Sequence, residues 1–343
     1  MVKKKINLAL QGGGAHGAYT WGVLDRLLEE DDLEISAISG TSAGALNGAA
    51  LKAGMISGGR QGARDNLDWL WQKVSGVGES QLSGWLAPFG VAAISRAMEY
   101  SWHSAVSTAM TQIVSPYAYG PAYKNPLREI VEKFNYDLVC GQDAPRLFVG
   151  ATKVRDGKIK VFEGDEIGPD ALLASACLPT LFQAVDIPDP VTGKSEAYWD
   201  GGYTGNPALF PLYTRNLPPD IVIININPLE RADLPKTPIE IQNRINEISF
   251  NSSLLRELRA IEFVQRLLDT GRIEEGQMNR VYIHMIADDD LMSKLSTATK
   301  TVPNPAVISA LRAAGRASAA RFLTNDIDHV GKRSSVDLKT MFS

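Results

Sequence analysis

The sequence predicts an α/β fold built around a largely parallel sheet. Short runs rich in Val, Ile and Leu alternate with longer stretches of helical pattern, and this alternation is typical of strand–helix–strand units. The apolar runs are nearly continuous, which indicates strands covered on both faces. The chain shows no internal repeat and no low-complexity linker, so we expect a single domain over residues 1–343.

Six strands are expected, at residues 6–10, 35–38, 146–154, 159–164, 220–227 and 280–287. Asp156-Gly157 stands between the third and fourth and predicts a hairpin there. Helical patterns cover residues 17–30, 43–54, 64–75, 124–134, 168–177, 238–270 and 303–323. Pro126 and Pro305 lie near the starts of two of these helices, where proline is favoured. The long segment 238–270 is expected to pack on the sheet, with a dimer contact as the alternative.

Composition and charge exclude several classes of protein. A formal net charge of −4 gives no broad basic field, so nucleic acid is not expected as a partner. Cys140 and Cys177 make no disulfide framework and fit a reducing compartment. The apolar run after the three lysines is shorter than the roughly 7–15 residues of an export signal. No stretch approaches the ~18 consecutive apolar residues of a membrane span. We therefore expect a cytoplasmic protein.

One region concentrates tryptophan and lacks a strand pattern. Residues 66–110 hold four of the six tryptophans, Trp69, Trp71, Trp85 and Trp102. Amphipathic aromatic side chains gather over apolar pockets and at lipid surfaces. We expect a helical insertion at about residues 64–120 that covers an acyl pocket or contacts a membrane surface transiently. A helical subdomain with tryptophan as core filler is the alternative.

A glycine-rich loop, GGGAHG at residues 12–17, follows the first strand and precedes the first helix. It matches the G-x-G-x-x-G pattern of dinucleotide-binding folds, which also require an acidic residue at the end of the second strand. Here the acidic residues at 29–34 come before or at the start of that strand. The spacing therefore disfavours a dinucleotide site.

The second strand ends instead in GTSAG at residues 40–44, which fits the G-x-S-x-G nucleophile elbow. Because adjacent parallel strands bring their carboxyl-end loops to one edge, we expect the glycine loop beside Ser42. Backbone N–H groups that point at a developing oxyanion stabilise acyl transfer. Gly12, Gly13 and Gly14 are therefore candidates for an oxyanion hole, with Gly13 and Gly14 preferred. A tight turn that binds nothing is the alternative.

A serine nucleophile needs a base, and Asp200 is the candidate. Gly201 and Gly202 follow it and leave space around its carboxylate, which can accept the serine proton within hydrogen-bond reach. A Ser42–Asp200–His284 triad is the alternative, but His284 lies inside an apolar strand, as a core histidine does. Asn206-Pro207 is expected to close the loop, with the Asn206 side chain bonded to backbone.

These motifs, in this order, resemble those of the patatin-like phospholipases, over about residues 5–210. GGGAHG, GTSAG and DGG match the family's glycine loop, elbow and aspartate motif, and ASACLPTLFQAV at 174–185 is similar to a segment that packs near the active site. One position departs from the family pattern, because His16 stands where the family usually has arginine or lysine. The remaining residues, about 211–343, form a C-terminal extension that we cannot match.

The resemblance implies a three-layer α/β/α sandwich with a largely parallel central sheet and a helical, aromatic-rich insertion. It implies a Ser42–Asp200 dyad without histidine and an oxyanion hole from the glycine loop. The activity implied is hydrolysis of a fatty acyl ester or phospholipid through an acyl-Ser42 intermediate, without metal or organic cofactor. An acyltransferase with the same dyad is one alternative, and a catalytically silent lipid-binding protein is another. Head group, acyl chain length and oligomeric state stay open.

Overall fold

The computed structural model describes residues 3–77, 91–99, 115–141, 143, 145–189, 193–274 and 276–342. Its centre is an eight-stranded sheet in the order β5-β6-β3-β2-β1-β7-β8, with β4 paired to β3 outside this order. The strands are β1 (Lys4–Leu10), β2 (Leu33–Thr41), β3 (Arg146–Lys153), β4 (Ile159–Glu163), β5 (Val185–Pro188), β6 (Ser195–Asp200), β7 (Asp220–Ile224) and β8 (Tyr282–Ile286).

The middle of the sheet is parallel, as predicted. Strands β3, β2, β1, β7 and β8 pair in parallel, whereas β4 and β6 pair with β3 in antiparallel fashion and β5 with β6 likewise. All six expected strands are present, and the Asp156-Gly157 turn joins β3 to β4. Strands β5 and β6 were not predicted, because these short strands are only half-buried and carry charged residues.

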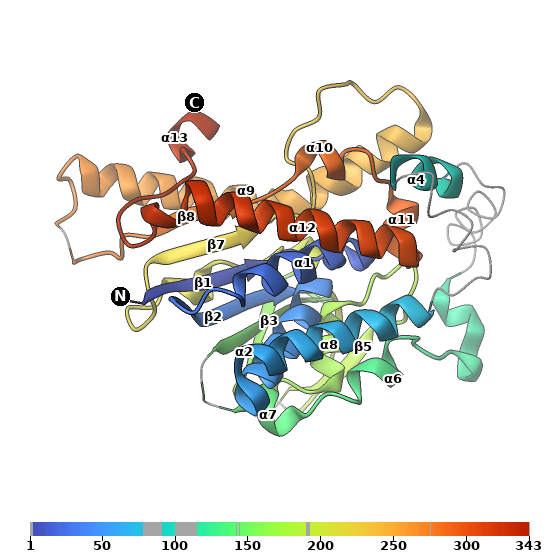
Figure 1. Ribbon diagram of the computed structural model, residues 1–343. Coiled ribbons are helices and arrows are strands. Elements are labelled where there is room, and N and C mark those ends of the chain that lie inside the picture. Colours follow the sequence, from blue (N-terminus) through green and yellow to red (C-terminus); the bar gives the residue numbers. More distant parts are fainter. Residues whose placement is uncertain are drawn as a thin grey trace.

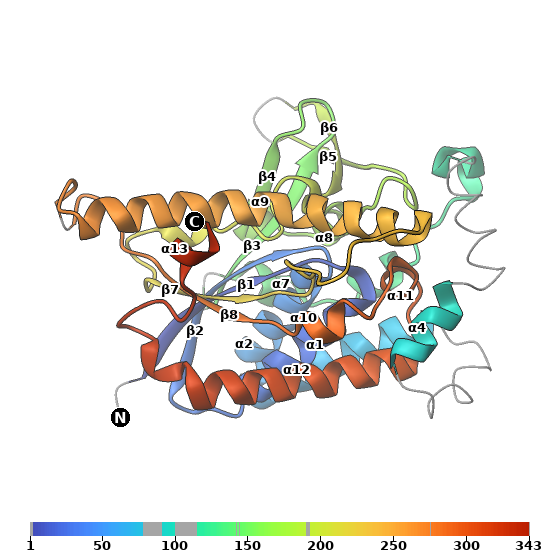
Figure 2. The ribbon, with the colours of Figure 1, turned by 90° about the horizontal axis from the view of Figure 1, so that it is seen from above.

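Helices cover both faces of this sheet, so the three-layer α/β/α arrangement is confirmed (Figures 1 and 2). Helices α1 (Gly17–Leu27), α2 (Ala43–Val77) and α12 (Pro305–Asn325) lie on one face, and α9 (Pro238–Asp269) lies on the other. Side chains of one strand alternate between the two layers: Leu8 and Leu10 pack in the α1 layer, and Ala9 packs in the α9 layer. Burial on both sides explains the continuous apolar runs.

The helix bounds differ from the expected ones in two places. The patterns at 43–54 and 64–75 belong to α2, which is interrupted by non-helical backbone at Gly58 and Gly59. The stretch 124–134 forms only one short helix, α6 (Arg128–Val131), so that prediction was largely wrong. The remaining helices are α4 (Val91–Glu99), α7 (Tyr136–Cys140), α8 (Pro169–Ser175), α10 (Asp289–Met292), α11 (Thr297–Thr301) and α13 (Leu338–Met341).

Two of the four clustered tryptophans belong to the core. Trp71 is buried, stacks on Trp21 at 6.3 Å between ring centroids, and donates its indole N–H to Asn47 Oδ1 at 2.9 Å. Trp69 packs edge-on against Phe134. For this pair, core filling was the right interpretation. Trp85 and Trp102 lie outside the described residues, so the expected cap over an acyl pocket stays a prediction.

Within the described ranges, the helices are either too short or too polar to cross a bilayer.

Candidate active site

Ser42 stands at the tip of a sharp turn between β2 and α2. Its φ is 54°, and it is the one non-glycine residue of the described chain with a positive φ. The turn leaves no space for larger neighbours: a Cβ on Gly40 would lie 2.7 Å from the backbone of Gly44, and one on Gly44 would clash with the Leu10 carbonyl. Small residues therefore let the backbone fold back on itself and present Ser42 at the start of a helix, as an elbow requires.

Strand β3 brings Asp200 next to this serine. One edge of β3 pairs with β4, and the opposite edge pairs first with β2 and then with β6. Thr41 lies opposite Gly150, and Asp200 lies opposite the next residue, Ala151. The last residues of β2 and β6 thus meet end to end on one edge of β3.

The Asp200 carboxylate is buried, at 1% exposure, and its Oδ1 accepts a hydrogen bond from the Gly202 N–H at 2.7 Å. Burial raises the pKa of Asp200 from 3.8 to about 7. The Gly202 hydrogen bond and the nearby Ser42 hydroxyl oppose this rise. A carboxylate with a pKa near neutrality can take and return a proton.

The glycine loop lies against the elbow. A Cβ on Gly12 would be 2.8 Å from the Ser42 Cβ, so glycine is required for this close approach. The Gly12 N–H is already taken, because it donates to Asn206 Oδ1 at 2.6 Å. In contrast, the N–H groups of Gly13 and Gly14 donate to no other described residue. Of the three candidate donors, Gly13 and Gly14 are thus available in this state.

Residues 174–185 support both members of the pair. The Ser175 hydroxyl accepts a hydrogen bond from the Ser42 N–H at 2.9 Å and donates to the Gly150 carbonyl at 2.6 Å. The Asp200 N–H donates to the Cys177 carbonyl at 2.8 Å. This segment therefore fixes the backbone of both residues. Sequence reasoning placed it near the site without assigning a residue.

The alternative bases are not beside Ser42. His284, in β8, is hydrogen-bonded to Asp220 of β7 at 2.9 Å and to Ser335 of the C-terminal loop at 3.2 Å. His16 turns away from the loop backbone and contacts Thr299 Oγ1 at 2.8 Å. Burial, and then the charge of Lys300, hold the pKa of His16 well below its usual value, so it is neutral. The alternative Ser42–Asp200–His284 triad is therefore not formed.

The dinucleotide interpretation also fails. Strand β2 ends in Thr41 at the edge that carries the glycine loop, and the acidic residues at 29–34 lie at its opposite end. Glu29 instead pairs with Arg64 and Arg316 in a cluster that ties α1, α2 and α12 together. The ribose of a dinucleotide would thus meet a serine rather than a carboxylate. Among the described residues, no three His, Cys, Asp or Glu side chains are grouped as metal ligands.

Comparison with known proteins assigns the family. A profile described as Patatin-like phospholipase matches residues 8–213, more than half of the chain. The chain belongs to the patatin-like phospholipase family. Membership supports a lipid acyl hydrolase at the level of the family. No curated protein sequence matches the chain.

Solved structures give a weak overall likeness. VipD from Legionella pneumophila is 13% identical with a TM-score of 0.41, and the match covers 94% of this chain and 67% of VipD. The type III effector protein ExoU is 14% identical with a TM-score of 0.35, and the match covers 94% of this chain and 53% of ExoU. The patatin-like chain described here thus spans about half to two thirds of these larger proteins.

Three polar side chains beside the patatin-like motifs, Gln11, Asn227 and Asn251, were not singled out from the sequence. They are buried and bond to one another, to Asn206 or to the glycine loop. Asn227 follows β7, at the carboxyl edge of the parallel sheet, and this position alone marks it as a site candidate. Asn206 was expected to bond to backbone, and it does so across to Gly12.

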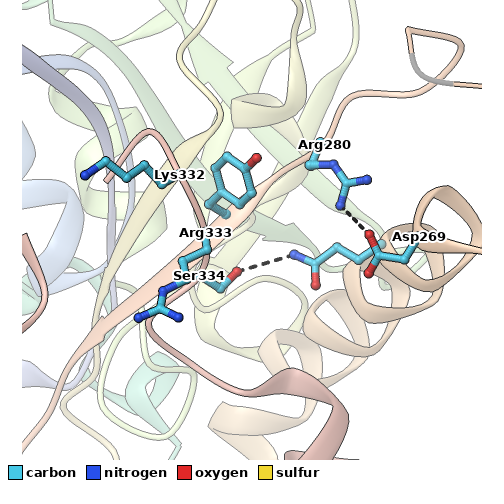
Figure 3. Close-up of a pocket in the computed structure, with 7 residues that line it drawn as sticks. Asp269, Arg280, Lys332, Arg333 and Ser334 are labelled. Carbon is cyan, nitrogen blue, oxygen red and sulfur yellow. Dashed lines mark hydrogen bonds and ion pairs between the residues drawn. The ribbon is translucent and has the colours of Figure 1, made fainter. Parts of the chain in front are cut away.

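A hollow elsewhere in the described chain is separate from this site. Figure 3 shows it between α9, β8 and the C-terminal loop, with Arg280, Lys332 and Arg333 at its rim. It adjoins Tyr282, the first residue of β8, whereas Ser42 follows the last residue of β2. Since these strands run in parallel, the hollow and Ser42 lie at opposite edges of the sheet.

Proposed function

We propose that this chain is a serine lipid acyl hydrolase that cleaves carboxylic esters through an acyl-Ser42 intermediate. The observation that carries the proposal is the meeting of β2 and β6 on one edge of β3, which places Ser42 beside the buried Asp200. In this scheme Ser42 is the nucleophile, Asp200 is the general base, and Gly13 and Gly14 supply the oxyanion hole.

The reaction follows from this arrangement. Ser42 Oγ attacks the acyl carbonyl carbon while its proton passes to Asp200. The carbonyl oxygen becomes an oxyanion, which accepts hydrogen bonds from the N–H groups of Gly13 and Gly14. The tetrahedral intermediate then collapses, and the departing alkoxide takes the proton from Asp200. Water attacks the acyl-Ser42 ester in the second half, with Asp200 again as base, and releases the fatty acid.

The pH dependence follows from the burial of Asp200. The base must be ionised to accept a proton, and its pKa is about 7. We therefore expect kcat/KM to rise as the pH increases through about 7, since only the ionised fraction of free enzyme reacts.

The test is ester hydrolysis by Ser42→Ala, with Ser335→Ala as matched control. Ser335 is a suitable control because it bonds to His284, which in turn bonds to Asp220, so it also has an acid–base partner. We expect Ser42→Ala to lose at least about 10⁴-fold in kcat on a p-nitrophenyl ester. Ser335→Ala should keep activity and labelling by a fluorophosphonate.

Two outcomes would overturn the proposal. If folded Ser42→Ala retains activity, or if the fluorophosphonate-labelled peptide lies outside residues 40–44, Ser42 is not the nucleophile. If the parent protein binds liposomes without turnover, the chain is a lipid-binding protein instead. Adding lysolipid acceptors and measuring transacylated product distinguishes acyl transfer from hydrolysis with the same dyad.

A further inference from the structure

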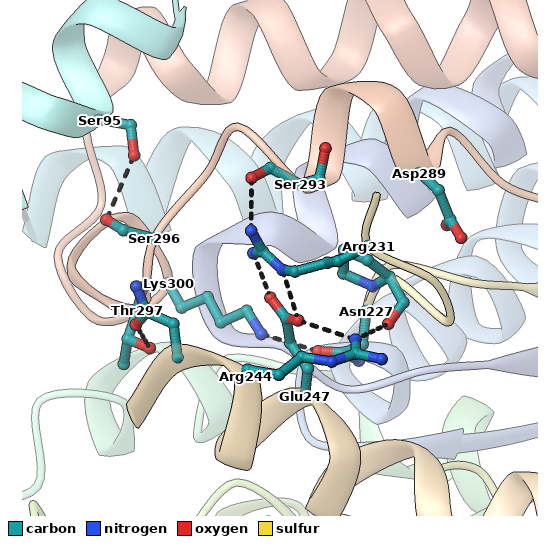
Figure 4. Close-up of polar contacts among 12 residues, drawn as sticks. Ser95, Asn227, Arg231, Arg244, Glu247, Asp289, Ser293, Ser296, Thr297 and Lys300 are labelled. Carbon is teal, nitrogen blue, oxygen red and sulfur yellow. Dashed lines mark hydrogen bonds and ion pairs between the residues drawn. The ribbon is translucent and has the colours of Figure 1, made fainter. Parts of the chain in front are cut away.

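A lysine from the C-terminal extension lies against the glycine loop. Lys300 belongs to α11, outside the range matched by the family profile. Its ammonium group donates to Asn227 Oδ1 at 2.8 Å, as Figure 4 shows. Its backbone carbonyl occupies the space where a Cβ on Gly14 would stand. The backbone of Lys300 therefore contacts the loop that precedes α1 directly, and its side chain reaches this loop through Asn227.

Asn227 transmits this contact to one particular peptide group. The Asn227 Nδ2 donates to the Gly12 carbonyl at 2.9 Å and to Gln11 Oε1 at 3.2 Å. The Gly12 carbonyl belongs to the same planar, trans peptide as the Gly13 N–H, and the two groups point in opposite directions. Holding the Gly12 carbonyl on the Asn227 side therefore aims the Gly13 N–H at the opposite side, away from Asn227.

The ammonium also decides which way the Asn227 amide lies. A lysine ammonium is a donor only, so the Asn227 oxygen must face it and the Asn227 nitrogen must face the Gly12 carbonyl. Without Lys300, a flipped amide would turn its oxygen toward the Gly12 carbonyl. The ammonium further polarises the chain of hydrogen bonds that ends in the Gly13 peptide and makes its N–H a stronger donor.

We propose that Lys300 is a positioning residue for the oxyanion loop, which orients the Gly13 N–H through Asn227. The inference rests on the proposed function, since it concerns how the same oxyanion hole is held. It also accounts for His16, the departure from the family pattern. The loop carries a neutral histidine at that position, and its nearby cation comes from α11 instead.

The charge on Lys300 is sensitive to pH. Burial, with Arg231 adding to it and Glu247 opposing it, lowers the pKa of Lys300 to about 8. The charged and titratable groups around it are Glu247, Arg231, Arg244, Glu99 and neutral His16. Glu247 is already shared between Arg231 at 2.5 Å and Arg244 at 3.2 Å. Above about pH 8 the ammonium loses its proton and the loop loses its cation.

The experiment compares Lys300→Met and Lys300→Arg with the parent protein on a soluble ester. We expect Lys300→Met to lose about 10- to 100-fold in kcat, below the roughly 10²- to 10³-fold cost of losing a direct oxyanion donor. KM should change little, because the oxyanion exists only in the transition state. Lys300→Arg should restore most of kcat, since a guanidinium also donates and stays protonated.

The pH profile separates this role from a structural one. The kcat/KM of the parent should fall as the pH rises through about 8. In Lys300→Arg this fall should move to higher pH, while the rise of kcat/KM near pH 7 should stay in place. Lys52 offers the control, because it is a buried lysine whose ammonium also donates to an oxygen, the Gly141 carbonyl, at 2.6 Å. Lys52→Met should leave both limbs in place.

Two results would overturn the inference while the proposed function stands. In the first, folded Lys300→Met keeps full kcat while Ser42→Ala is inactive. In the second, the fall of kcat/KM at alkaline pH stays at the same pH in Lys300→Arg as in the parent. The second measurement decides the matter even if Lys300→Met does not fold. Activity in Ser42→Ala would instead reject the proposed function itself. A double variant with Asn227→Leu should lose no more than the larger single loss, and additive losses would show that Lys300 does not act through Asn227.

Discussion

Among the described residues, two groups each bring a serine together with a buried aspartate. One is Ser42 with Asp200, at the carboxyl edge of β2. The other is Ser335 with His284 and Asp220, on β7, β8 and the C-terminal loop. By residue type alone, the second group is the more familiar catalytic set, because it has serine, histidine and aspartate in one chain of hydrogen bonds.

Backbone geometry separates the two groups. Asp220 is closed off, since its Oδ1 also accepts the Gly331 N–H at 2.9 Å and its histidine partner is fully buried. Ser42 has the strained φ of an elbow, a helix start behind it, and a loop with two unused N–H groups in front. A hydroxyl becomes a plausible nucleophile through the backbone around it, more than through the identity of its base.

The largest expected difference is in activity after the same substitution at the two aspartates. Asp200→Asn removes the proposed base and should lower kcat by about 10³- to 10⁴-fold, the upper range for general-base catalysis. Asp220→Asn should leave the kcat of the folded fraction within about threefold, because Asp220 contacts none of the proposed site residues. Equal losses in both variants, measured per folded molecule, would contradict the distinction drawn here.

The same two variants should change stability in opposite directions above neutral pH. The folded-state pKa of Asp200 is raised from 3.8 to about 7, so between these values the folded protein binds more protons than the unfolded chain. Stability attributable to Asp200 therefore falls as the pH rises from about 4 to 7, by roughly 4 kcal/mol at most. Asp200→Asn lacks this titration and should gain stability over the parent as the pH rises through this interval.

Asp220→Asn should instead lose roughly 1–3 kcal/mol, because it weakens the buried hydrogen bonds that Asp220 makes with His284 and accepts from the Gly331 N–H. Urea titrations of parent and both variants at about pH 5 and pH 8 measure these differences. If the difference in unfolding free energy between Asp200→Asn and the parent is the same at both pH values, ionising Asp200 does not destabilise the folded protein.

Much of this arrangement could be predicted from the sequence. The strands with continuous Val, Ile and Leu, the GTSAG elbow and the DGG motif each carry a local signal, and parallel pairing brings the first two to one edge. The pairing of β6 carried no such signal, since Ser195–Asp200 is half-buried and polar. The contact of Asp200 with Ser42 depends on that pairing. The DGG turn made Asp200 a candidate base and the family resemblance supported it, but no local pattern showed that the two residues meet.

The residues that support the elbow and the glycine loop could not be predicted from local sequence patterns. Lys300 lies in a short helix 284 positions after His16 in the numbering, and nothing in the segment TATKT indicates a contact with a glycine loop. Ser175 and Asn206 act through side-chain hydrogen bonds to backbone groups far away in the chain. Such contacts depend on the final packing of α8, α11 and the sheet, which no local sequence window contains.

Ser42 has a glycine loop beside it and Ser335 does not. Substitutions in this loop should have an effect on kcat of intermediate size. Gly14 has a φ of +56°, and a Cβ there would clash with the Lys300 carbonyl, so Gly14→Ala must displace the loop. A Cβ on Gly13 would meet only the end of the Ile226 side chain, at 2.9 Å, which can move aside. We expect Gly14→Ala to lose about 10²-fold in kcat, as for one lost oxyanion donor, and Gly13→Ala to lose far less.

The measurement for this pair is kcat on a soluble ester, with circular dichroism to confirm folding. A milder effect at Gly14 than at Gly13 would mean that the N–H groups of this loop do not face the reacting carbonyl as proposed.

The smallest expected effect concerns the strain at Ser42. A left-handed backbone costs an L-residue with a Cβ roughly 1–2 kcal/mol and costs glycine almost nothing, although glycine also loses more entropy on folding. Ser42→Gly and Ser42→Ala should both be inactive, but Ser42→Gly should be more stable by about 1 kcal/mol, measured by urea denaturation. At Ser335, whose φ is not positive, the same pair should reverse, with alanine the more stable. If glycine is no better than alanine at position 42, the elbow stores no strain, and the backbone contrast between the two serines loses its energetic basis.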